Sequence, residues 1–149
     1  ENNLRGTVPP FAGSTGSLQS LDLFGLEQVT GNFGRMLSTL PPLHLDFLNV
    51  GSSGLTGTIP TEIGEFDRLT QMYLHQTRLN GTMPSEIGQL TELVEQLSWR
   101  DCFISGSLPT EIGRLTALQT IFFHNNQMTG TIPTEIGNMT SLRTFEGRT

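Results

Sequence analysis

The sequence predicts an α/β fold: a right-handed solenoid of about six coils of about 24 residues, with a parallel β-sheet on the concave face and short 3₁₀ or helical turns on the convex face. Two observations predict it. Similar segments that begin with glycine recur at a nearly fixed interval, and leucine-like residues recur at fixed places between them. The chain's 17 glycines and 8 prolines follow the same repeat, which indicates turns rather than disorder.

Four segments with the pattern Gly-x-x-Pro-x-Glu-Ile-Gly define the repeat. They begin at Gly57, Gly81, Gly106 and Gly130, at intervals of 24, 25 and 24 residues. Between them, an alternation of the Leu-x-Leu kind predicts a short strand with alternate side chains in the core. The Pro-Thr/Ser-Glu-Ile-Gly stretch predicts a helical turn, which the hydroxyl of Thr61 and its equivalents could cap.

The whole chain, 1–149, is expected to form a single solenoid that is regular over 45–149 and degenerate over 1–44. The segment 24–42 fits the repeat poorly, and its glycines and prolines predict an irregular loop or a distorted coil. The sequence begins in mid-repeat at Glu1 and stops in the strand of the last unit, so both ends of the core are expected to be open. We therefore expect a portion of a longer protein, or ends that another chain covers.

Charge and cysteine content exclude several classes of function. The net charge is −6 and the chain has no lysine, which disfavours nucleic acids and anionic membrane surfaces as partners. The apolar runs are far shorter than a membrane span, so no membrane contact is expected within this segment. The single cysteine, Cys102, cannot form an internal disulfide.

The pattern L-x-x-L-x-L-x-x-N/C-x-L-x-G-x-I-P-x-x-I-G extends from Leu45 to Phe145. It resembles the plant-type leucine-rich repeat (LRR), which occurs in receptor-like kinase ectodomains and polygalacturonase-inhibiting proteins. The resemblance implies a receptor-like, secreted or cell-surface module. It also implies an inward ladder, in which an asparagine or cysteine bonds the backbone between coils. The ladder positions are Asn2, Ser53, Thr77, Cys102 and Asn126, and this position makes Cys102 structural rather than a nucleophile.

The family uses the concave strand face to bind partners, and the outward positions of this chain suggest the ligand. A basic column of His75, Arg100, His124 and Arg148 lies beside aromatic residues in an otherwise acidic chain. This arrangement favours an acidic peptide or an anionic glycan, although a variable solvated face could be basic by chance. The expected partner-binding residues are Tyr73, His75, Arg78, Arg100, Phe103, Phe122, His124 and Arg148.

Four further patterns are candidates for sites. Asn80-Gly81-Thr82 and Asn138-Met139-Thr140 are N-glycosylation sequons, which weakly support a secreted glycoprotein. Threonines and serines flank the repeated glycines and are expected to stack as two columns, as on an ice-binding surface; threonine also simply suits an exposed extended backbone. The repeated glutamates form a turn motif rather than a catalytic pair. His75 and His124 are two coils apart, so we expect no metal and no cofactor.

The sequence thus favours a non-catalytic module that recognises a protein, peptide or glycan through its concave strands. We expect no catalytic residues. One alternative is a structural protein that associates end to end, through uncapped ends, into a filament or matrix. Another is an ice-binding protein that uses the Thr/Ser columns.

Overall fold

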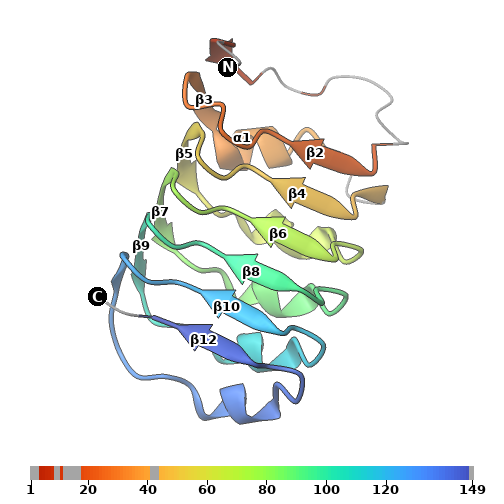
Figure 1. Ribbon diagram of the computed structural model, residues 1–149, viewed down its shortest axis with the longest axis vertical. Helices are drawn as coiled ribbons and strands as arrows, with labels where there is room; N and C mark the ends of the chain where they lie inside the picture. Colours follow the sequence, from red (N-terminus) through yellow and green to blue (C-terminus); the bar gives the residue numbers. More distant parts are fainter. Residues whose placement is uncertain (1–3, 9–10, 12–17, 41–43, 148–149) are drawn as a thin grey trace.

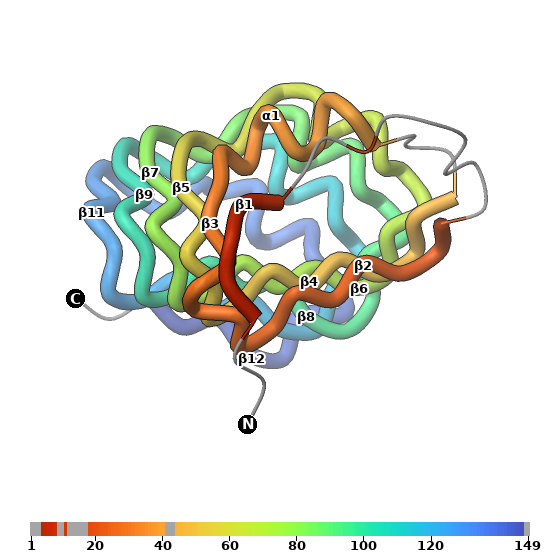
Figure 2. Tube along the Cα trace, turned by 90° about the horizontal axis from the view of Figure 1, so that it is seen from above, coloured from red at the N-terminus to blue at the C-terminus, as the bar shows by residue number. Residues whose placement is uncertain are grey.

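The computed structural model describes residues 4–8, 11, 18–40 and 44–147. The chain forms a stack of coils, with its N-terminal part at one end and its C-terminal part at the other (Figure 1). Seen along the stack, each coil passes through a first sheet, a second sheet and a helical segment that surround one interior (Figure 2). No helix in this part of the chain is long and apolar enough to cross a membrane.

The first sheet contains the predicted Leu-x-Leu strands. Its six strands are all parallel and neighbour one another in chain order. The middle residue of each strand points into the interior, and Leu48, Met72, Leu97 and Ile121 are fully buried. The strands are β2 (Ser20–Asp22), β4 (Phe47–Asn49), β6 (Gln71–Tyr73), β8 (Gln96–Ser98), β10 (Thr120–Phe122) and β12 (Thr144–Glu146).

A second parallel sheet, which the sequence did not predict, crosses the repeated glycines. Its strands are β1 (Gly6–Thr7), β3 (Val29–Asn32), β5 (Gly54–Thr58), β7 (Arg78–Thr82), β9 (Phe103–Gly106) and β11 (Gln127–Met128). Gly81 has a φ of +78°, and a Cβ there would lie 2.8 Å from Cγ2 of Thr58 in the preceding coil. Glycine is therefore required at this position for both its backbone angle and its close contact.

The register of the second sheet differs from the predicted threonine columns. Thr58 pairs with Asn80, and Asn80 pairs with Phe103. In the next row, Thr82 pairs with Ser105 and Ser105 with Gln127. Each row therefore joins different positions of the repeat. The reason is that the repeated glycine of one strand pairs with the residue two positions before the repeated glycine of the next strand. The prediction that the threonines stack as two continuous columns is wrong.

Four helical turns form the side opposite the first sheet, as predicted. They are the 3₁₀ helices η2 (Thr61–Glu65), η3 (Ser85–Gln89), η4 (Thr110–Arg114) and η5 (Thr134–Asn138). Proline, not threonine or serine, is the N-cap of each, and no cap side chain makes a hydrogen bond. The hydroxyl of Thr61 instead donates to Oε2 of Glu62, so our capping prediction was wrong.

The segment that fits the repeat poorly contains a distorted coil with a true helix. β3 is followed by α1 (Phe33–Leu37), whose N-cap Asn32 accepts a hydrogen bond from the backbone N–H of Arg35 at 2.9 Å. Phe33, Met36 and Leu37 are buried. Their spacing of three and four residues is helical, so it was a signal for this helix. Residues 41–43, including the proline pair, lie outside the described residues.

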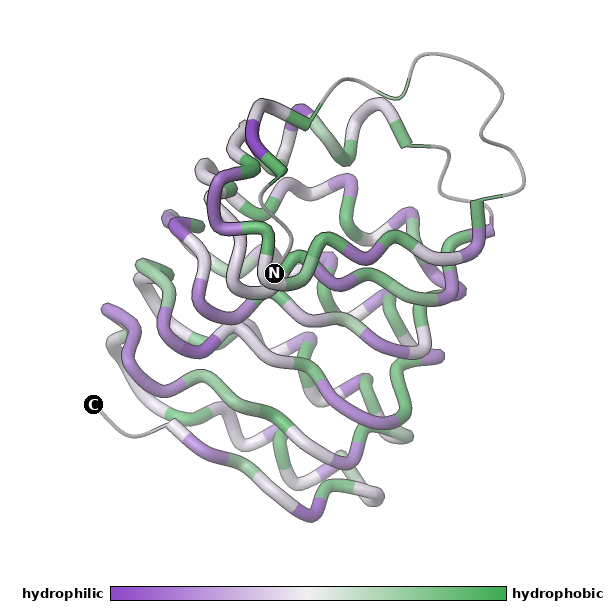
Figure 3. Tube along the Cα trace, turned by 45° about the horizontal axis from the view of Figure 1, so that its top comes forward, coloured by the Kyte–Doolittle hydropathy of each residue, from purple (hydrophilic) through white to green (hydrophobic). Residues whose placement is uncertain are grey.

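The interior is one continuous apolar column along the stack. Each coil contributes residues from both sheets and from its helical turn, and the largest fully buried side chains include Trp99, Phe33 and Phe66. The same apolar positions recur from coil to coil as green segments between polar ones (Figure 3). Stability therefore arises mainly from contacts between neighbouring coils.

The ladder residues lie inside the fold, but they do not all join coils. Asn126 Nδ2 donates to the carbonyl of Trp99 in the preceding coil at 2.8 Å, and Asn126 Oδ1 accepts from the N–H of Ile104 at 2.9 Å. Cys102 Sγ also reaches back, to the carbonyl of Leu74 at 3.3 Å. Ser53 donates only within its own coil, to the carbonyl of Val50. Thr77 donates to the carbonyl of Leu74 in its own coil, and its hydroxyl also lies 3.3 Å from Cys102 Sγ in the next coil. Asn2 lies outside the described residues.

The repeat that contains β8 is one residue longer than its neighbours, and the extra residue lies at the start of this strand. The N–H of Val94 donates to Thr70, and the carbonyl of Val94 accepts from Gln119, so the hydrogen bonds between coils are regular up to Val94. The pairing of β8 with β6 then begins with Leu97 opposite Met72. The extra residue therefore lies between Val94 and Leu97, and the register beyond it is regular.

Candidate functional site

The outer face of the first sheet carries an imidazole that leans over a glycine. His75 follows β6 and projects outward, because its neighbour Leu74 is fully buried in the interior. A Cβ at Gly51, in the preceding coil, would lie 2.8 Å from Cε1 and 2.9 Å from Nε2 of His75. Only glycine at position 51 leaves room for the imidazole ring to lie across the preceding coil.

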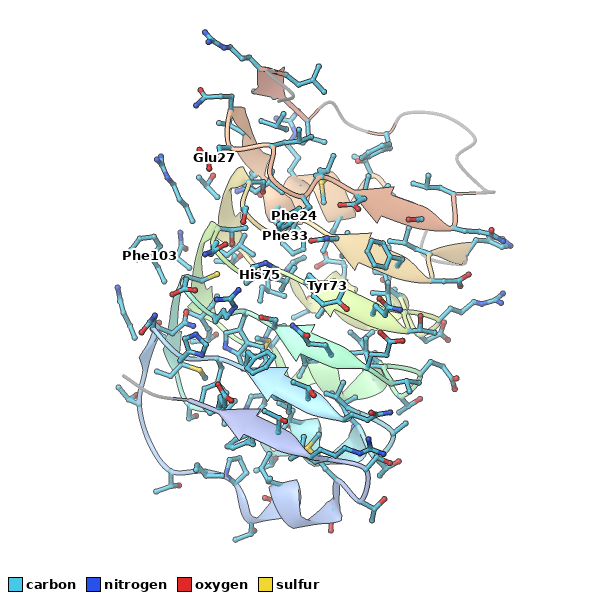
Figure 4. All side chains as sticks on the ribbon, in the orientation of Figure 1. Phe24, Glu27, Phe33, Tyr73, His75 and Phe103 are labelled. Atoms are coloured by element: carbon cyan, nitrogen blue, oxygen red, sulfur yellow. The ribbon has the colours of Figure 1, made fainter. Side chains whose placement is uncertain are left out.

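This position brings His75 into an aromatic cluster, which we define as Phe24, Phe47, Tyr73 and His75. The ring centroids of Phe24 and His75 are 5.9 Å apart, those of Tyr73 and His75 6.3 Å, and those of Phe47 and Tyr73 5.9 Å. Phe24 is 55% exposed. In Figure 4, Phe24, Tyr73 and His75 lie together over the first sheet. The cluster is a preformed surface against which an aromatic or apolar group of a ligand can pack.

The sequence predicted Tyr73 and His75 on this face but missed the two phenylalanines. Phe47 pairs in register with Gln71, and Phe24 holds the place of Gly51 and His75 in the first coil. Aligning the degenerate first coil on its strand would have given the signal for Phe24. Phe47 lies within the regular range, but its position is polar in the later coils, as at Gln71, so the column carried no aromatic signal.

Two buried polar atoms on or beside this face lack a hydrogen-bond partner. They are Nδ1 of His75 and Oγ of Ser98, and Ser98 is fully buried. Ser98 is on the Tyr73 column, with Tyr73 and Phe122 as its two neighbours in register. Buried polar atoms are rarely left without a partner, because the lost hydrogen bond to water is costly. Both atoms are enclosed by the protein, so neither is an exposed donor or acceptor on the outer face.

The predicted basic column is less cationic than its composition indicates. Burial lowers the pKa of His75 below its usual 6.5, and the charge of Arg100 lowers it further, although Asp101 opposes this. The imidazole is therefore neutral at pH 7. Arg100 is half-buried, and its Nη1 lies 3.3 Å from Oδ2 of Asp101. Asp101 also accepts a hydrogen bond from Asn125, at 2.6 Å.

The C-terminal part of the same face carries a second, smaller aromatic pair. Phe122 and His124 are both half-buried, and their rings form an edge contact with centroids 6.3 Å apart. Phe122 pairs in register with Ser98 on one side and with Glu146 on the other. Arg148, the last predicted member of the basic column, lies outside the described residues.

Two predicted partner-binding residues lie on a different face. Arg78 begins β7 and Phe103 begins β9, so both belong to the second sheet. Figure 4 shows Phe103 at the edge of the molecule, apart from Tyr73 and His75. Our assignment of both residues to the concave strand face was wrong. The chain turns sharply between the two sheets, at left-handed residues such as Gln76 and Asp101.

The structure also places the two sequon asparagines and Cys102. Asn80 is exposed in β7, and Asn138 is exposed at the end of η5. Burial raises the pKa of the Cys102 thiol, which agrees with a structural ladder residue and not with a nucleophile. Within the described ranges, no group of three His, Cys, Asp or Glu side chains could hold a metal ion.

A cleft of about 680 Å³ lies at the C-terminal end of the stack. Its apolar lining includes Phe123, Met128, Ile132 and Phe145, and Ile132 is 62% exposed. The cleft lies where the apolar column reaches the surface at this end of the stack. It is not on the outer face of the first sheet. It is the feature that an end-to-end association would cover.

The lowered pKa of His75 predicts a specific dependence of stability on pH. The unfolded chain gains a proton on His75 near pH 6.5, whereas the folded chain does not, so stability falls as pH drops through that range. We expect His75→Phe to remove this contribution. Urea unfolding at about pH 7 and about pH 5 should show a smaller loss of stability for the variant. An equal loss in both proteins would contradict a lowered pKa, and His44→Phe serves as the control.

Comparisons with known proteins identify the repeat. The family model for the Leucine Rich Repeat matches residues 117–139. The LRR ectodomain of the plant membrane receptor kinase GASSHO1/SCHENGEN3 from Arabidopsis thaliana, in complex with CASPARIAN STRIP INTEGRITY FACTOR 2, is 29% identical with a TM-score of 0.87. That match covers 99% of this chain and 17% of the receptor chain. A comparison with curated protein sequences gives no significant match.

A second solved structure agrees. The plant peptide hormone receptor RGFR1, in complex with RGF2, is 33% identical with a TM-score of 0.89, over 98% of this chain and 23% of that one. The present chain thus spans about a fifth of the length of these two receptor chains. The repeat spacing, the parallel sheets with 3₁₀ turns and these matches lead to one conclusion. The chain has the plant-type leucine-rich repeat fold of these receptors.

Proposed function

We propose that this chain is a non-catalytic recognition module, at the cell surface or outside the cell, that binds a peptide or protein through the outer face of its first sheet. The observation that carries the proposal is the aromatic cluster, in which Phe24 is 55% exposed. Aromatic residues are enriched on surfaces that bind partners.

The chemistry of this face supports a mixed ligand. Phe24, Phe47 and Tyr73 offer apolar area, and the half-buried, neutral His75 adds a polar ring edge. Arg100 adds one positive charge, which a carboxylate could share with Asp101. A peptide with an aromatic side chain near an acidic group fits these features better than a uniformly anionic glycan.

The structural relatives support the same class of ligand. The first is a receptor kinase ectodomain in complex with CASPARIAN STRIP INTEGRITY FACTOR 2, and the second is a plant peptide hormone receptor in complex with RGF2. Ectodomains of this kind are recognition modules rather than enzymes. The extracellular location proposed here follows from the same likeness.

The proposal predicts that two residues of the face dominate binding. Tyr73→Ala and Arg100→Ala should each weaken the binding of a hit from a library of short acidic, aromatic peptides by at least about tenfold. The cause is the loss of an apolar anchor in one variant and of a charge-assisted bond in the other. Isothermal titration calorimetry gives the affinities, and differential scanning calorimetry should show little change in melting temperature.

The matched control is Arg114→Ala, because Arg114 is an exposed arginine in η4, on the side opposite the first sheet. It should leave the affinity unchanged. A peptide that binds both first-sheet variants as tightly as the original chain would exclude this face as the site. Sedimentation of the same samples over a range of concentrations distinguishes ligand binding from end-to-end association, which the C-terminal cleft would favour.

A further inference from the structure

We propose that Asn80 is an N-glycosylation site whose first sugar packs against the ring of Phe103. The inference rests on the extracellular location proposed above, but not on the binding face. It joins two features that the recognition function leaves unexplained. One is a sequon within a strand of the second sheet, and the other is a phenylalanine that is 51% exposed on the neighbouring strand.

The register of the second sheet places these two residues side by side. Asn80 in β7 is the partner of Phe103 in β9. Leu79 and Ile104, the residues next to them in the chain, are fully buried. Because successive side chains of a strand point to opposite faces, Asn80 and Phe103 both point to solvent from the same face. Paired positions on adjacent strands are close enough for their side chains to touch.

The other neighbours of Asn80 are polar or lack a side chain, and Arg78, two residues earlier on the same face of β7, is exposed. On the opposite side, its partner is Thr58, a small residue. The next residue, Gly81, has no side chain, and the sequon hydroxyl of Thr82 is exposed. An N-acetylglucosamine on Asn80 would therefore meet one large apolar neighbour, the ring of Phe103. The C–H groups on one face of a pyranose ring are apolar, and covering them with an aromatic ring removes both surfaces from water.

The second sequon lacks this arrangement. Asn138, at the end of η5, lies in a shallow groove with Glu111, Arg114 and Glu135. These neighbours are charged, and none is aromatic. A glycan on Asn138 would consequently remain in solvent, which makes this sequon an internal control for the effect of Phe103.

The test is a double-mutant cycle on the full chain, secreted from eukaryotic cells. Its members are the original chain, Phe103→Ser, Asn80→Gln and the double variant. Peptide mass mapping after removal of N-glycans reports occupancy at Asn80 and Asn138. We expect Asn80 to be occupied. Phe103→Ser should then lower the melting temperature by about 2–4 °C more when the glycan is present than in the Asn80→Gln background.

Two further measurements isolate the first sugar. Trimming the glycan to a single N-acetylglucosamine should preserve the coupling, and complete enzymatic removal should abolish it. Phe24→Ser is the matched control, because Phe24 is exposed to a similar degree, 55%, but belongs to the first-sheet face. Its cost should be the same with and without the glycan.

Either of two results would overturn the proposal: an unmodified Asn80 in the secreted protein, or an equal cost of Phe103→Ser in both backgrounds. Both measurements are made without any ligand. A failure here therefore leaves the peptide-binding proposal standing, and a failure of peptide binding leaves this one standing.

Discussion

Replacing Asn126 with alanine is expected to lower the free energy of unfolding by about 3–5 kcal/mol. The Asn126 amide donates to the carbonyls of Trp99, Phe123 and His124 and accepts from the N–H of Ile104. Alanine would leave these backbone groups without their partner in a partly buried position. Two of the bonds join neighbouring coils, so the loss weakens the stacking itself. Urea unfolding followed by circular dichroism measures the change.

Ser53→Ala is the control at the equivalent ladder position. The Ser53 hydroxyl makes one bond, of 2.6 Å, to the carbonyl of Val50 in its own coil. Its loss should cost about 1 kcal/mol, because no contact between coils is removed. If Asn126→Ala cost no more than Ser53→Ala, the bonds between coils would not be what distinguishes the asparagine.

Gly88→Ala should be the other severe substitution, with a loss of about 3 kcal/mol or more. A Cβ at Gly88 would overlap with the carbonyl oxygen of Glu111 in the next coil and lie 2.8 Å from its carbonyl carbon. The obstacle is backbone, so a change of rotamer cannot relieve it. The 3₁₀ turns η3 and η4 would have to separate, which would loosen the column beneath them. Thermal and urea unfolding both measure the effect.

The same repeat position offers graded controls. At Gly64 the nearest atom to a Cβ is the end of the Gln89 side chain, which can move, so Gly64→Ala should cost about 1 kcal/mol. At Gly137 no atom lies within 4 Å, and Gly137→Ala should be neutral or slightly stabilising. If all three alanine variants were equally stable, backbone contact between turns would not be the reason for the glycine.

The repeat made much of the fold predictable from the sequence. Inward positions such as Met72 and Leu97 and the helical turns each follow from a residue type that recurs at a fixed interval. The ladder at Cys102 and Asn126 is instead what the family resemblance implied. A recurring position has one environment in every coil, so a single physical argument applies to all of them. The likeness to solved plant receptor ectodomains agrees with that part of the prediction.

The sequence predictions that failed concern features that depend on how the coils are offset from one another. The second sheet has glycine at its centre, and glycine carries no apolar signal for a strand. The sharp turn at Asp101 places Phe103 in that sheet, although the sequence prediction had grouped Phe103 with the outward positions of the Leu-x-Leu strands. The lean of His75 over Gly51 joins residues 24 positions apart, and it depends on a missing side chain rather than a present one.

The extra residue between Val94 and Leu97 has a consequence for how such an array can change in length. The hydrogen bonds on either side of it remain regular, and the pairing of Leu97 with Met72 and with Ile121 is preserved. A coil can thus gain a residue at the entrance of its strand without shifting the contact surfaces that it presents to its two neighbours. Units of unequal length are therefore interchangeable within one stack, and duplication or recombination of whole coils can proceed without a matching change elsewhere.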